Sequence, residues 1–363
     1  MTLSVTLQHA FAGFTLDVAF EAPPGLTVLF GRSGSGKTTV VNAVAGLLRP
    51  DRGRVTVAGR VLCDTPAGLW LPPHRRRLGY VFQEGRLFPH LTVRQNLTYG
   101  ARFAPKGTGG GDLAAVVVLL GIGALLDRRP GALSGGEKSR VAIGRALLCN
   151  PDLLLMDEPL AALDEARKDE ILPYLERLRD ETAVPILYVS HSVAEVARLA
   201  TTVVVLQAGR VARIGPASEV LADPATAPAL DLREAGAVIE ARLVAQEPDG
   251  LSVLETSAGR LYLPRIEAAP GTGFRVRIHA NDVILSRARP EGLSALNILP
   301  GTVETVHLGD GPGALVQVRS GSDLILARLT RRSATALGLT PGTPCHAILK
   351  TVAVGRGDVG SGL

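Results

Sequence analysis

Apolar and polar positions follow two patterns at the start of the chain. They alternate over residues 3–20, which predicts two short strands joined by a turn. Residues 26–30 are apolar except for Thr27 and predict a buried strand. A helix is expected from Lys37 to about Leu48, just before Pro50. A buried strand that leads into a helix is typical of α/β proteins.

The alternation of strand and helix continues to about residue 206. Apolar runs at 153–156, 186–189 and 202–206 predict further strands, and helices are expected at 166–181 and 193–200. Strands that alternate with helices form a mainly parallel sheet covered on both faces. The fold class predicted for this part of the chain is therefore α/β.

Beyond about residue 235 the pattern changes to short β-like runs broken by Gly and Pro. It predicts an all-β, OB-like domain over residues 234–363, after a first domain over residues 1–233. The segment GAVIE at 236–240 is echoed by GTVET at 301–305. Two small barrels of about 65 residues each would explain this echo, and chance similarity in Gly- and Val-rich sequence is the alternative.

Composition indicates a folded protein of two or three domains. The formal net charge of +5 comes from 39 basic and 34 acidic residues, with 4% aromatic residues, so nucleic-acid binding is not expected. The three cysteines form no CxxC pair, which argues against disulfides and fits a reducing cytosol. We expect neither a signal peptide nor a spanning helix, because the longest apolar stretch, 113–126, is shorter than the ~20 residues required.

Residues 31–38 match the pattern GxxxxGK[ST] between a predicted strand and a predicted helix. Small residues let successive backbone N–H groups surround the β- and γ-phosphate oxygens at the positive end of the helix. Lys37 adds a cation for these phosphates, and Thr38 offers a hydroxyl to Mg²⁺. The residues predicted to bind ATP here are Gly31, Arg32, Ser33, Gly34, Ser35, Gly36, Lys37, Thr38 and Thr39.

The apolar strand expected at 153–156 leads directly into Asp157 and Glu158. Ligands of α/β proteins bind at the carboxyl ends of strands, so two adjacent carboxylates here predict a catalytic site. Asp157 would bind Mg²⁺ through water, and Glu158 would accept a proton from the attacking water or orient it. A strand that merely ends in an acidic turn is the simpler alternative.

The segment LSGGEKSR at 133–140 resembles the signature sequence of ABC transporter ATPases. The resemblance implies a P-loop NTPase fold, with a mainly parallel sheet core and antiparallel β and helical subdomains, followed by an all-β TOBE domain. It also implies that the signature segment binds the γ-phosphate of the ATP held by another subunit. The residues concerned are Ser134, Gly135, Gly136 and Glu137. An N-capped helix would explain Ser134 but not its distance from the other motifs.

Three further motifs of this family occur in the expected order. Gln83 matches the glutamine that contacts Mg²⁺ or water and passes its movement to membrane subunits. Asp164 matches the loop that crosses the dimer interface, and His191 matches the histidine that contacts the γ-phosphate. A single histidine after a strand is more often structural. Because the other motifs occur in the expected order, a catalytic role is favoured for this one. The resemblance thus implies catalytic Glu158, His191 and Gln83, and a magnesium site of Thr38, Gln83 and Asp157.

Family members stack adenine on an aromatic residue of the first hairpin. Phe11 is the better candidate in this sequence and Phe14 the second, with core packing as an equal alternative for either. Arg32 stands where many members have proline. This departure leaves the loop chemistry intact, since that position contributes backbone more than side chain.

One set of motifs occurs in this chain, and the signature of one copy must complete the nucleotide site of another. We therefore expect a two-fold homodimer that encloses two ATP molecules. The resemblance implies two transmembrane permease subunits and a peripheral position on the cytoplasmic face of the bacterial inner membrane. A non-transport ABC ATPase that acts on DNA or ribosomes is disfavoured, because such proteins usually carry paired cassettes or a long coiled-coil insertion.

Residues 77–90 and 187–192 resemble the ATPase subunit of bacterial molybdate importers. Residues 293–301 and 348–351 resemble the Mop/TOBE domain of that subunit, expected here at about 291–356. The resemblance implies import of molybdate or tungstate, with a periplasmic molybdate-binding protein as an indirect partner. Importers of sulfate, iron, sugars or polyamines share the ATPase motifs and remain alternatives, as does an oxyanion storage or sensing protein.

A tetrahedral oxyanion is bound by N–H and O–H donors together with a cation. Ser294, Asn297, Lys350 and the surrounding backbone could supply these groups. A domain of this kind would sense internal oxyanion and restrain the ATPase. Leu296 replaces an arginine that is common in the family pattern, so a structural or dimerising β domain is the alternative.

Overall fold

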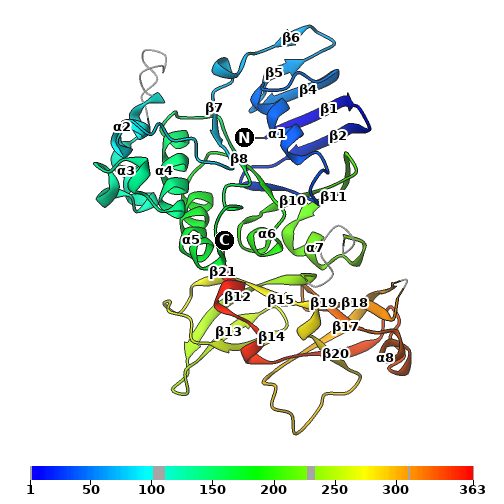
Figure 1. Cartoon of the computed structure of the whole chain (residues 1–363). Helices are drawn as coiled ribbons and strands as arrows, with labels where there is room; N and C mark the ends of the chain where they lie inside the picture. Colours follow the sequence, from blue (N-terminus) through cyan, green and yellow to red (C-terminus); the bar gives the residue numbers. More distant parts are fainter. Residues whose placement is uncertain (1, 101–110, 227–233, 310, 363) are drawn as a thin grey trace. The chain divides into compact units, whose positions relative to one another are not determined.

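The computed structural model describes residues 2–100, 111–226, 234–309 and 311–362 (Figure 1). Unit 1 comprises Met1–His191 and Leu199–Ile214, and unit 2 comprises Ser192–Arg198 and Gly215–Leu363. The boundary predicted between residues 233 and 234 touches the segment 227–233, which lies outside the described residues. That boundary stays a prediction.

Unit 1 is built on a mixed sheet that has 11 strands within the described residues, in the order β6-β5-β4-β1-β2-β11-β10-β3-β9-β8-β7. The strands are β1 Leu3–Phe11, β2 Phe14–Ala22, β3 Leu26–Phe30, β4 Arg52–Val57, β5 Arg60–Asp64, β6 Leu69–Trp70, β7 Leu78–Val81, β8 Leu153–Asp157, β9 Ile186–Ser190, β10 Thr202–Gln207 and β11 Arg210–Pro216.

The half of this sheet around β3 is parallel. Strands β10, β3, β9, β8 and β7 pair in parallel, whereas β1, β2, β4, β5 and β6 pair antiparallel. Strands β3, β8 and β9 are buried along their whole length, as expected for parallel strands covered on both faces. The structure thus confirms the predicted parallel core with an antiparallel extension.

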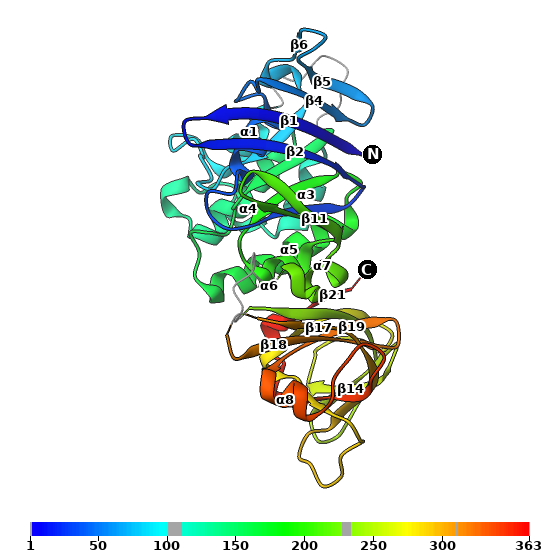
Figure 2. The ribbon, with the colours of Figure 1, turned by 90° about the vertical axis from the view of Figure 1, so that its right-hand side faces the viewer.

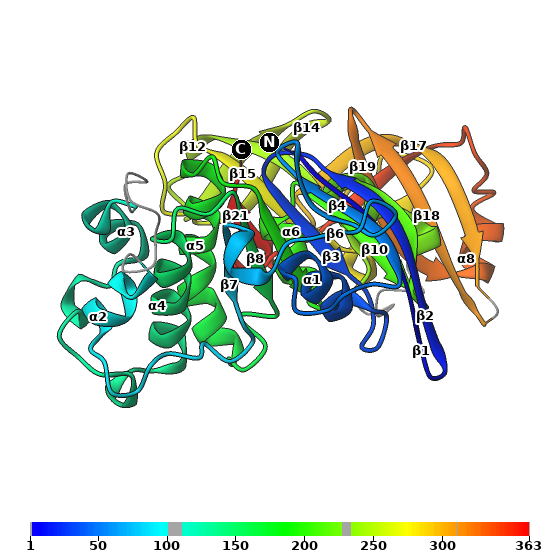
Figure 3. The same ribbon diagram turned by 90° about the horizontal axis from the view of Figure 1, so that it is seen from above.

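The helices of unit 1 are α1 Lys37–Ala45, α2 Val93–Thr98, α3 Leu113–Leu120, α4 Gly135–Leu147 and α5 Glu165–Glu181, with 3-10 helices at Pro73–Arg75, Gly123–Leu125 and Pro130–Ala132. Within unit 1, α2, α3 and α4 pack together at the end opposite the antiparallel strands β1, β2 and β4 (Figures 1 and 3). They form the helical subdomain implied by the family resemblance. No helix in the described part of the chain is long and apolar enough to cross a membrane.

Helix α1 is shorter than the sequence predicts. It ends at Ala45 because Gly46 takes a left-handed conformation, with φ of 80°, that closes the last turn. Two carbonyl groups of that turn, on Ala43 and Val44, each accept a hydrogen bond of 2.8 Å from the buried guanidinium of Arg76. A side chain distant in sequence therefore helps to end the helix.

In the described part of unit 2 the strands form two five-stranded sheets, β14-β13-β12-β15-β21 and β16-β20-β17-β18-β19 (Figure 2). The strands are β12 Gly236–Gln246, β13 Leu251–Thr256, β14 Gly259–Pro264, β15 Gly273–His279, β16 Ile284–Ser286, β17 Asn297–Leu308, β18 Gly313–Ser320, β19 Asp323–Thr330, β20 Pro344–Leu349 and β21 Val359–Ser361. The helices are α6 Val193–Leu199, α7 Ala217–Ala222 and α8 Arg331–Ala336, with 3-10 helices at Pro224–Thr226, Ala280–Asp282, Thr351–Ala353 and Arg356–Asp358.

The two sheets repeat one arrangement. In each, the four strands β12 to β15 or β17 to β20 lie in the order third, second, first, fourth. The GAVIE segment at 236–240 opens β12, and the GTVET segment at 301–305 lies within β17. The order of the strands therefore confirms the duplication that the sequence predicts.

The repeats are not independent barrels, however, because they exchange their fifth strands. β16 follows the first repeat in sequence but pairs with β20, and β21 follows the second repeat but pairs with β15. A single hydrophobic cluster contains side chains of both sheets, among them Leu243 and Val316. Sequence periodicity predicts that a segment is a strand but not which sheet it joins.

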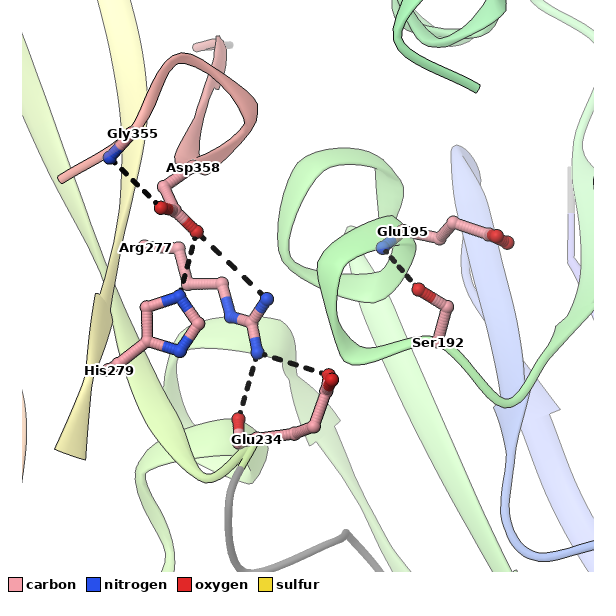
Figure 4. A network of polar contacts seen from close by, with 7 residues as sticks. All are labelled: Ser192, Glu195, Glu234, Arg277, His279, Gly355 and Asp358. Atoms are coloured by element: carbon pink, nitrogen blue, oxygen red, sulfur yellow. Dashed lines mark hydrogen bonds and ion pairs between the residues drawn. The ribbon is translucent and has the colours of Figure 1, made fainter. Parts of the chain in front are cut away.

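An ion-pair network around the buried Arg277 adjoins the exchanged strand β21 (Figure 4). The Oδ1 atom of Asp358, next to β21, lies 3.0 Å from Nε2 of His279 and 4.0 Å from Nη1 of Arg277. Nη2 of Arg277 donates to the backbone oxygen of Glu234 at 2.9 Å. Three separate segments of unit 2 thus meet at one guanidinium that is 6% exposed.

Candidate functional site

The loop at 31–38 connects the buried strand β3 to helix α1, as the sequence predicts. Gly36 has a φ of 104°, and a Cβ atom there would lie 2.7 Å from Cδ1 of Leu16. Only glycine therefore fits this close turn. The Nζ atom of Lys37 folds back over the loop and donates to the carbonyl oxygens of Gly31 at 2.7 Å and Arg32 at 3.1 Å.

The ammonium group of Lys37 is held in a nearly closed setting, with the residue 5% exposed. Burial lowers the pKa of Lys37, while the charges of Glu158 and then Asp157 act in the opposite direction. These two carboxylates lie at the end of β8, which is separated from β3 in the sheet only by β9. The loop, its cation and the predicted catalytic carboxylates are therefore brought together by the fold.

Thr38 and Asp157 meet although they are far apart in sequence. The hydroxyl of Thr38 donates to Oδ1 of Asp157 at 3.2 Å. Burial raises the pKa of Asp157, which is 9% exposed. Hydroxyl and carboxylate oxygens at this spacing are suitable ligands for a hard divalent cation such as Mg²⁺.

Glu158 has a strained backbone at the end of β8. Its φ is 46°, in the left-handed region that non-glycine residues rarely adopt, and its N–H donates to the carbonyl of Val189 at 3.2 Å. The Oε2 atom of Glu158 lies 3.5 Å from Nδ1 of His191. Strain of this kind clusters at active sites, and here it turns the carboxylate toward the residue that follows β9.

The predicted signature segment forms the N-terminus of α4. This helix begins at Gly135, because Ser134 caps it. The hydroxyl of Ser134 accepts from the N–H of Glu137 at 3.2 Å, and the Glu137 carboxylate accepts from the N–H of Ser134 at 2.7 Å. This capping box does not use the first-turn N–H groups of Gly135 and Gly136.

Within one copy the signature stands apart from the nucleotide loop. Ser134 makes its hydrogen bonds with Glu137 and, among the described residues, none with the loop at 31–38. A Cβ atom on Gly135 would lie 2.8 Å from Cδ2 of Leu163, so the signature adjoins the loop that carries Asp164. Asp164 caps α5 by accepting from the N–H of Arg167 at 2.9 Å.

The side chains of Gln83 and Phe11 are exposed. Gln83 follows β7 and is exposed. Phe11 lies at the end of β1 with 41% of its surface exposed. The half-buried ring of Phe14 packs instead near Gly36, its Cζ atom 3.2 Å from the position of a Cβ atom there. Phe11 therefore offers the more accessible aromatic face for a base.

The sequence did not predict a role for Tyr80. Its hydroxyl donates to Oδ1 of Asn42 on α1 at 3.1 Å and lies near the carboxylate of Asp157. Burial, followed by the charge of Asp157, raises the pKa of Tyr80. Its ring stacks on Phe82 at 4.0 Å between centroids. A polar residue in the middle of an otherwise apolar strand was the signal that could have revealed it.

The residues predicted to bind an oxyanion differ in their surroundings. Ser294 and Lys350 are exposed, whereas Asn297 is completely buried. The Asn297 amide accepts from the N–H of Tyr262 at 2.7 Å and donates to its carbonyl at 3.0 Å, which joins β17 to β14. Any oxyanion role for Asn297 requires these bonds to break. That role stays a prediction, which Ser294 and Lys350 are better placed to fulfil.

Comparison with known proteins decides the family. The family model "ABC transporter" matches residues 16–161, and the model "TOBE domain" matches residues 293–354. The chain is 52% identical over 364 aligned positions to the "Molybdenum import ATP-binding protein ModC" of Mesorhizobium japonicum, covering 100% of this chain and 98% of that one. The chain belongs to the ABC transporter family.

Other ABC proteins agree with this assignment. The protein of the same name from Rhizobium etli is 53% identical, covering 98% of this chain and 99% of that one. Among solved structures, cbiO1 from Clostridium perfringens, part of the ABC transporter complex cbiONQ, is 28% identical with a TM-score of 0.53, covering 64% of this chain and 94% of that one. The predicted fold class, an ABC ATPase followed by an all-β TOBE domain, is thereby confirmed.

Proposed function

We propose that this ABC protein is the ATP-hydrolysing subunit that energises import of molybdate through partner membrane subunits. The observation that carries the proposal is the identity of more than half with molybdenum-import ATP-binding proteins over the full chain, including both units. The geometry of unit 1 supports hydrolysis, because a phosphate loop, two carboxylates and a histidine converge at the ends of β3, β8 and β9.

The residues present fit a magnesium ion. Thr38 and Asp157 supply hard oxygen ligands 3.2 Å apart, and Mg²⁺ takes its remaining ligands from waters and nucleotide phosphates. We propose Gln83 as a further contact, since its exposed side chain follows β7, the neighbour of β8. When bound, the ion neutralises charge that develops on the phosphates.

Each residue of the site has a definable task in hydrolysis. Lys37 would exchange its hydrogen bonds to the Gly31 and Arg32 carbonyls for phosphate oxygens, which compensates its burial with a stronger charge-assisted contact. Glu158 would take the proton of the attacking water or orient that water. His191, 57% exposed beside Glu158, would donate to the γ-phosphate.

The signature segment supports a dimer as the working form. Ser134 uses its lone pair in the helix cap, so its hydroxyl proton remains to donate to a phosphate oxygen. The N–H groups of Gly135 and Gly136 add a helix N-terminus of 13 residues, which favours an anion. A second copy would place these groups, with Glu137 and Asp164, over the ATP bound at residues 31–39.

Membrane subunits would bind beside Gln83. A cavity of about 330 Å³ lies there, lined by residues of β7, the following loop and α4, among them Tyr80, Phe82, Arg86, Phe88 and Arg145. The Arg145 guanidinium holds this loop by donating to the carbonyls of Gly85 and Arg86. We propose that two permease subunits dock here, which places the chain at the cytoplasmic face of the bacterial inner membrane.

Reconstitution tests the cargo. The chain and its membrane subunits would be placed in vesicles, and ATP hydrolysis measured with binding proteins loaded with molybdate, tungstate, sulfate or iron. Stimulation by molybdate or tungstate is the expected result, with Glu158→Gln vesicles as the inactive control. Stimulation by another cargo, with no response to molybdate or tungstate, would overturn the assignment in favour of another importer.

A further inference from the structure

An acidic residue outside every family motif is tied to the end of the first hairpin. Asp51 directly precedes β4, and its Oδ2 atom accepts a hydrogen bond of 2.8 Å from the N–H of Ala10. The same oxygen lies 3.1 Å from Nδ1 of His9. One carboxylate atom therefore accepts from the backbone of β1 and contacts one of its side chains, immediately before Phe11.

The imidazole of His9 in turn contacts the exposed aromatic ring. Residues 9 and 11 point to the same face of β1 because side chains alternate along a strand. The ring centroids of His9 and Phe11 are 4.4 Å apart with the planes at 90°, an edge-to-face geometry that is attractive for aromatic pairs. The His9 side chain is 16% exposed, so its orientation is restricted.

Phe11 is also connected to the phosphate loop through packing contacts. Phe11 pairs with Phe14 across the hairpin, with ring centroids 6.2 Å apart. Phe14 and Leu16 both approach Gly36, the last glycine before Lys37. The Phe11 ring thus lies between two neighbours. His9 contacts Asp51, and Phe14 packs against the loop that would hold the phosphates.

We propose that Asp51, acting through His9, is a positioning residue that fixes the Phe11 ring as the stacking platform for the nucleotide base. The inference rests on the proposed function, in which ATP binds at residues 31–39 and its adenine stacks on Phe11. Asp51 itself touches neither the base nor the phosphates. It determines how well the aromatic face is ordered before ATP arrives, and preorganisation of this kind increases affinity.

Two ligands distinguish a role of Asp51 in ordering the aromatic ring for the base from a general role in supporting the phosphate loop. ATP uses both the platform and the loop, whereas inorganic tripolyphosphate uses the loop alone. Calorimetric titration of the full chain should show that Phe11→Ala weakens ATP binding about 10-fold, consistent with ~1 to 3 kcal/mol for stacking a base on an aromatic side chain. Asp51→Ala should weaken it about 3- to 10-fold, by loss of order in the ring. Neither variant should change tripolyphosphate affinity.

Further variants test whether Asp51 affects ATP binding by way of Phe11. Asp51→Asn keeps an oxygen acceptor for the Ala10 N–H and should recover most of the ATP affinity. The double variant with Phe11→Ala and Asp51→Ala should bind ATP no more weakly than Phe11→Ala alone. Asp17→Ala is the matched control, since Asp17 is an exposed acid of the same hairpin that accepts from Gln8 at 3.2 Å. It should behave as wild type.

Steady-state kinetics gives an independent readout. Asp51→Ala should raise KM for ATP while leaving kcat at saturating ATP unchanged, because the reacting groups are not touched. Equal loss of ATP and tripolyphosphate affinity, or fully additive losses in the double variant, would overturn the positioning role. Unchanged ATP affinity in Phe11→Ala would instead remove Phe11 from the proposed adenine site, and the role of Asp51 with it.

Discussion

The Oε2 atom of Glu158 and the Nδ1 atom of His191 lie 3.5 Å apart at the carboxyl ends of two adjacent parallel strands, β8 and β9. Glu158 reaches this position only by adopting a left-handed backbone with φ of 46°. The energetic cost of such a conformation is of order 1–3 kcal/mol. A carboxylate held at that cost beside a histidine is the arrangement expected of a group that handles a proton.

Replacement of Glu158 by glutamine should separate binding from turnover. Glutamine keeps the size and the hydrogen-bonding oxygen but cannot accept a proton from water, so kcat should fall about 10²- to 10⁴-fold. ATP affinity should be retained, and the dimer should accumulate with ATP bound. Size-exclusion chromatography with ATP and a phosphate-release assay would measure both. Turnover at the wild-type rate would exclude Glu158 as the base.

Replacement of Lys37 by alanine should abolish high-affinity nucleotide binding. The change removes a buried cation and leaves the Gly31 carbonyl without its 2.7 Å hydrogen bond. Hydrogen bonds to charged groups contribute about 1.5–3 kcal/mol each, so ATP affinity should fall at least about 10-fold. Calorimetry with ATP would measure this loss. Retained affinity would contradict the phosphate-binding role, and circular dichroism would verify that the variant is folded.

Removal of the Tyr80 hydroxyl should weaken Mg²⁺ binding at the site without abolishing it. In Tyr80→Phe, Asp157 keeps the hydrogen bond from Thr38 but loses the neighbouring Tyr80 hydroxyl, while the stack on Phe82 is retained. We expect an increase of about 3- to 10-fold in the Mg²⁺ concentration needed for half-maximal nucleotide binding, corresponding to about 1 kcal/mol for a hydrogen bond. A Mg²⁺ titration at fixed ATP would measure it. An unchanged midpoint would show that Thr38 alone positions Asp157.

The ion pairs at Asp358 should make the stability of unit 2 depend on pH. Burial alone would raise the pKa of Asp358, but the contact with His279 and the Gly355 N–H lower it below its ordinary value. A carboxyl group whose folded pKa is depressed contributes stability above its unfolded pKa of about 3.9 and loses it as pH falls through the folded value. Asp358→Asn should therefore unfold more easily at pH 7, by about 1–3 kcal/mol, and resemble wild type in strong acid.

Denaturant unfolding at several pH values would check this difference. Glu267→Gln is the matched control, because Glu267 is an exposed acid of unit 2 that pairs with Arg265 at 3.2 Å, and surface pairs contribute little. The control should follow the wild-type curve. An Asp358→Asn curve parallel to wild type at every pH would mean that the network does not stabilise β21.

Local signals in the sequence predicted much of unit 1. The mainly apolar runs at 26–30, 153–156 and 186–189 became β3, β8 and β9, because a strand buried on both faces is rich in apolar residues. The glycine loop required its turn whatever surrounds it. Parallel pairing of β8 with β9 then places Asp157 and His191 at the same edge of the sheet.

Partnerships between distant residues were not predictable in the same way. The Tyr80 hydroxyl meets Asn42 and Asp157, and Asp51 meets His9, because strands adjacent in the sheet are far apart in the chain. The early end of α1 at Ala45 depends on Arg76, whose buried guanidinium replaces solvent at the last carbonyls. Propensity and periodicity describe one segment at a time and contain no information on such contacts.

The sequence by itself determined the nucleotide loop, the buried strands β3, β8 and β9, and the duplication of unit 2, since these depend on periodicity and on spacing along the chain. Tertiary structure alone decided the conformation of Glu158 against His191, the hydrogen bonds that occupy Asn297, and the exchange of β16 and β21 between the two sheets. Strand pairing is decided by shared burial and by ion pairs such as His279 with Asp358, which form only when the whole unit is assembled.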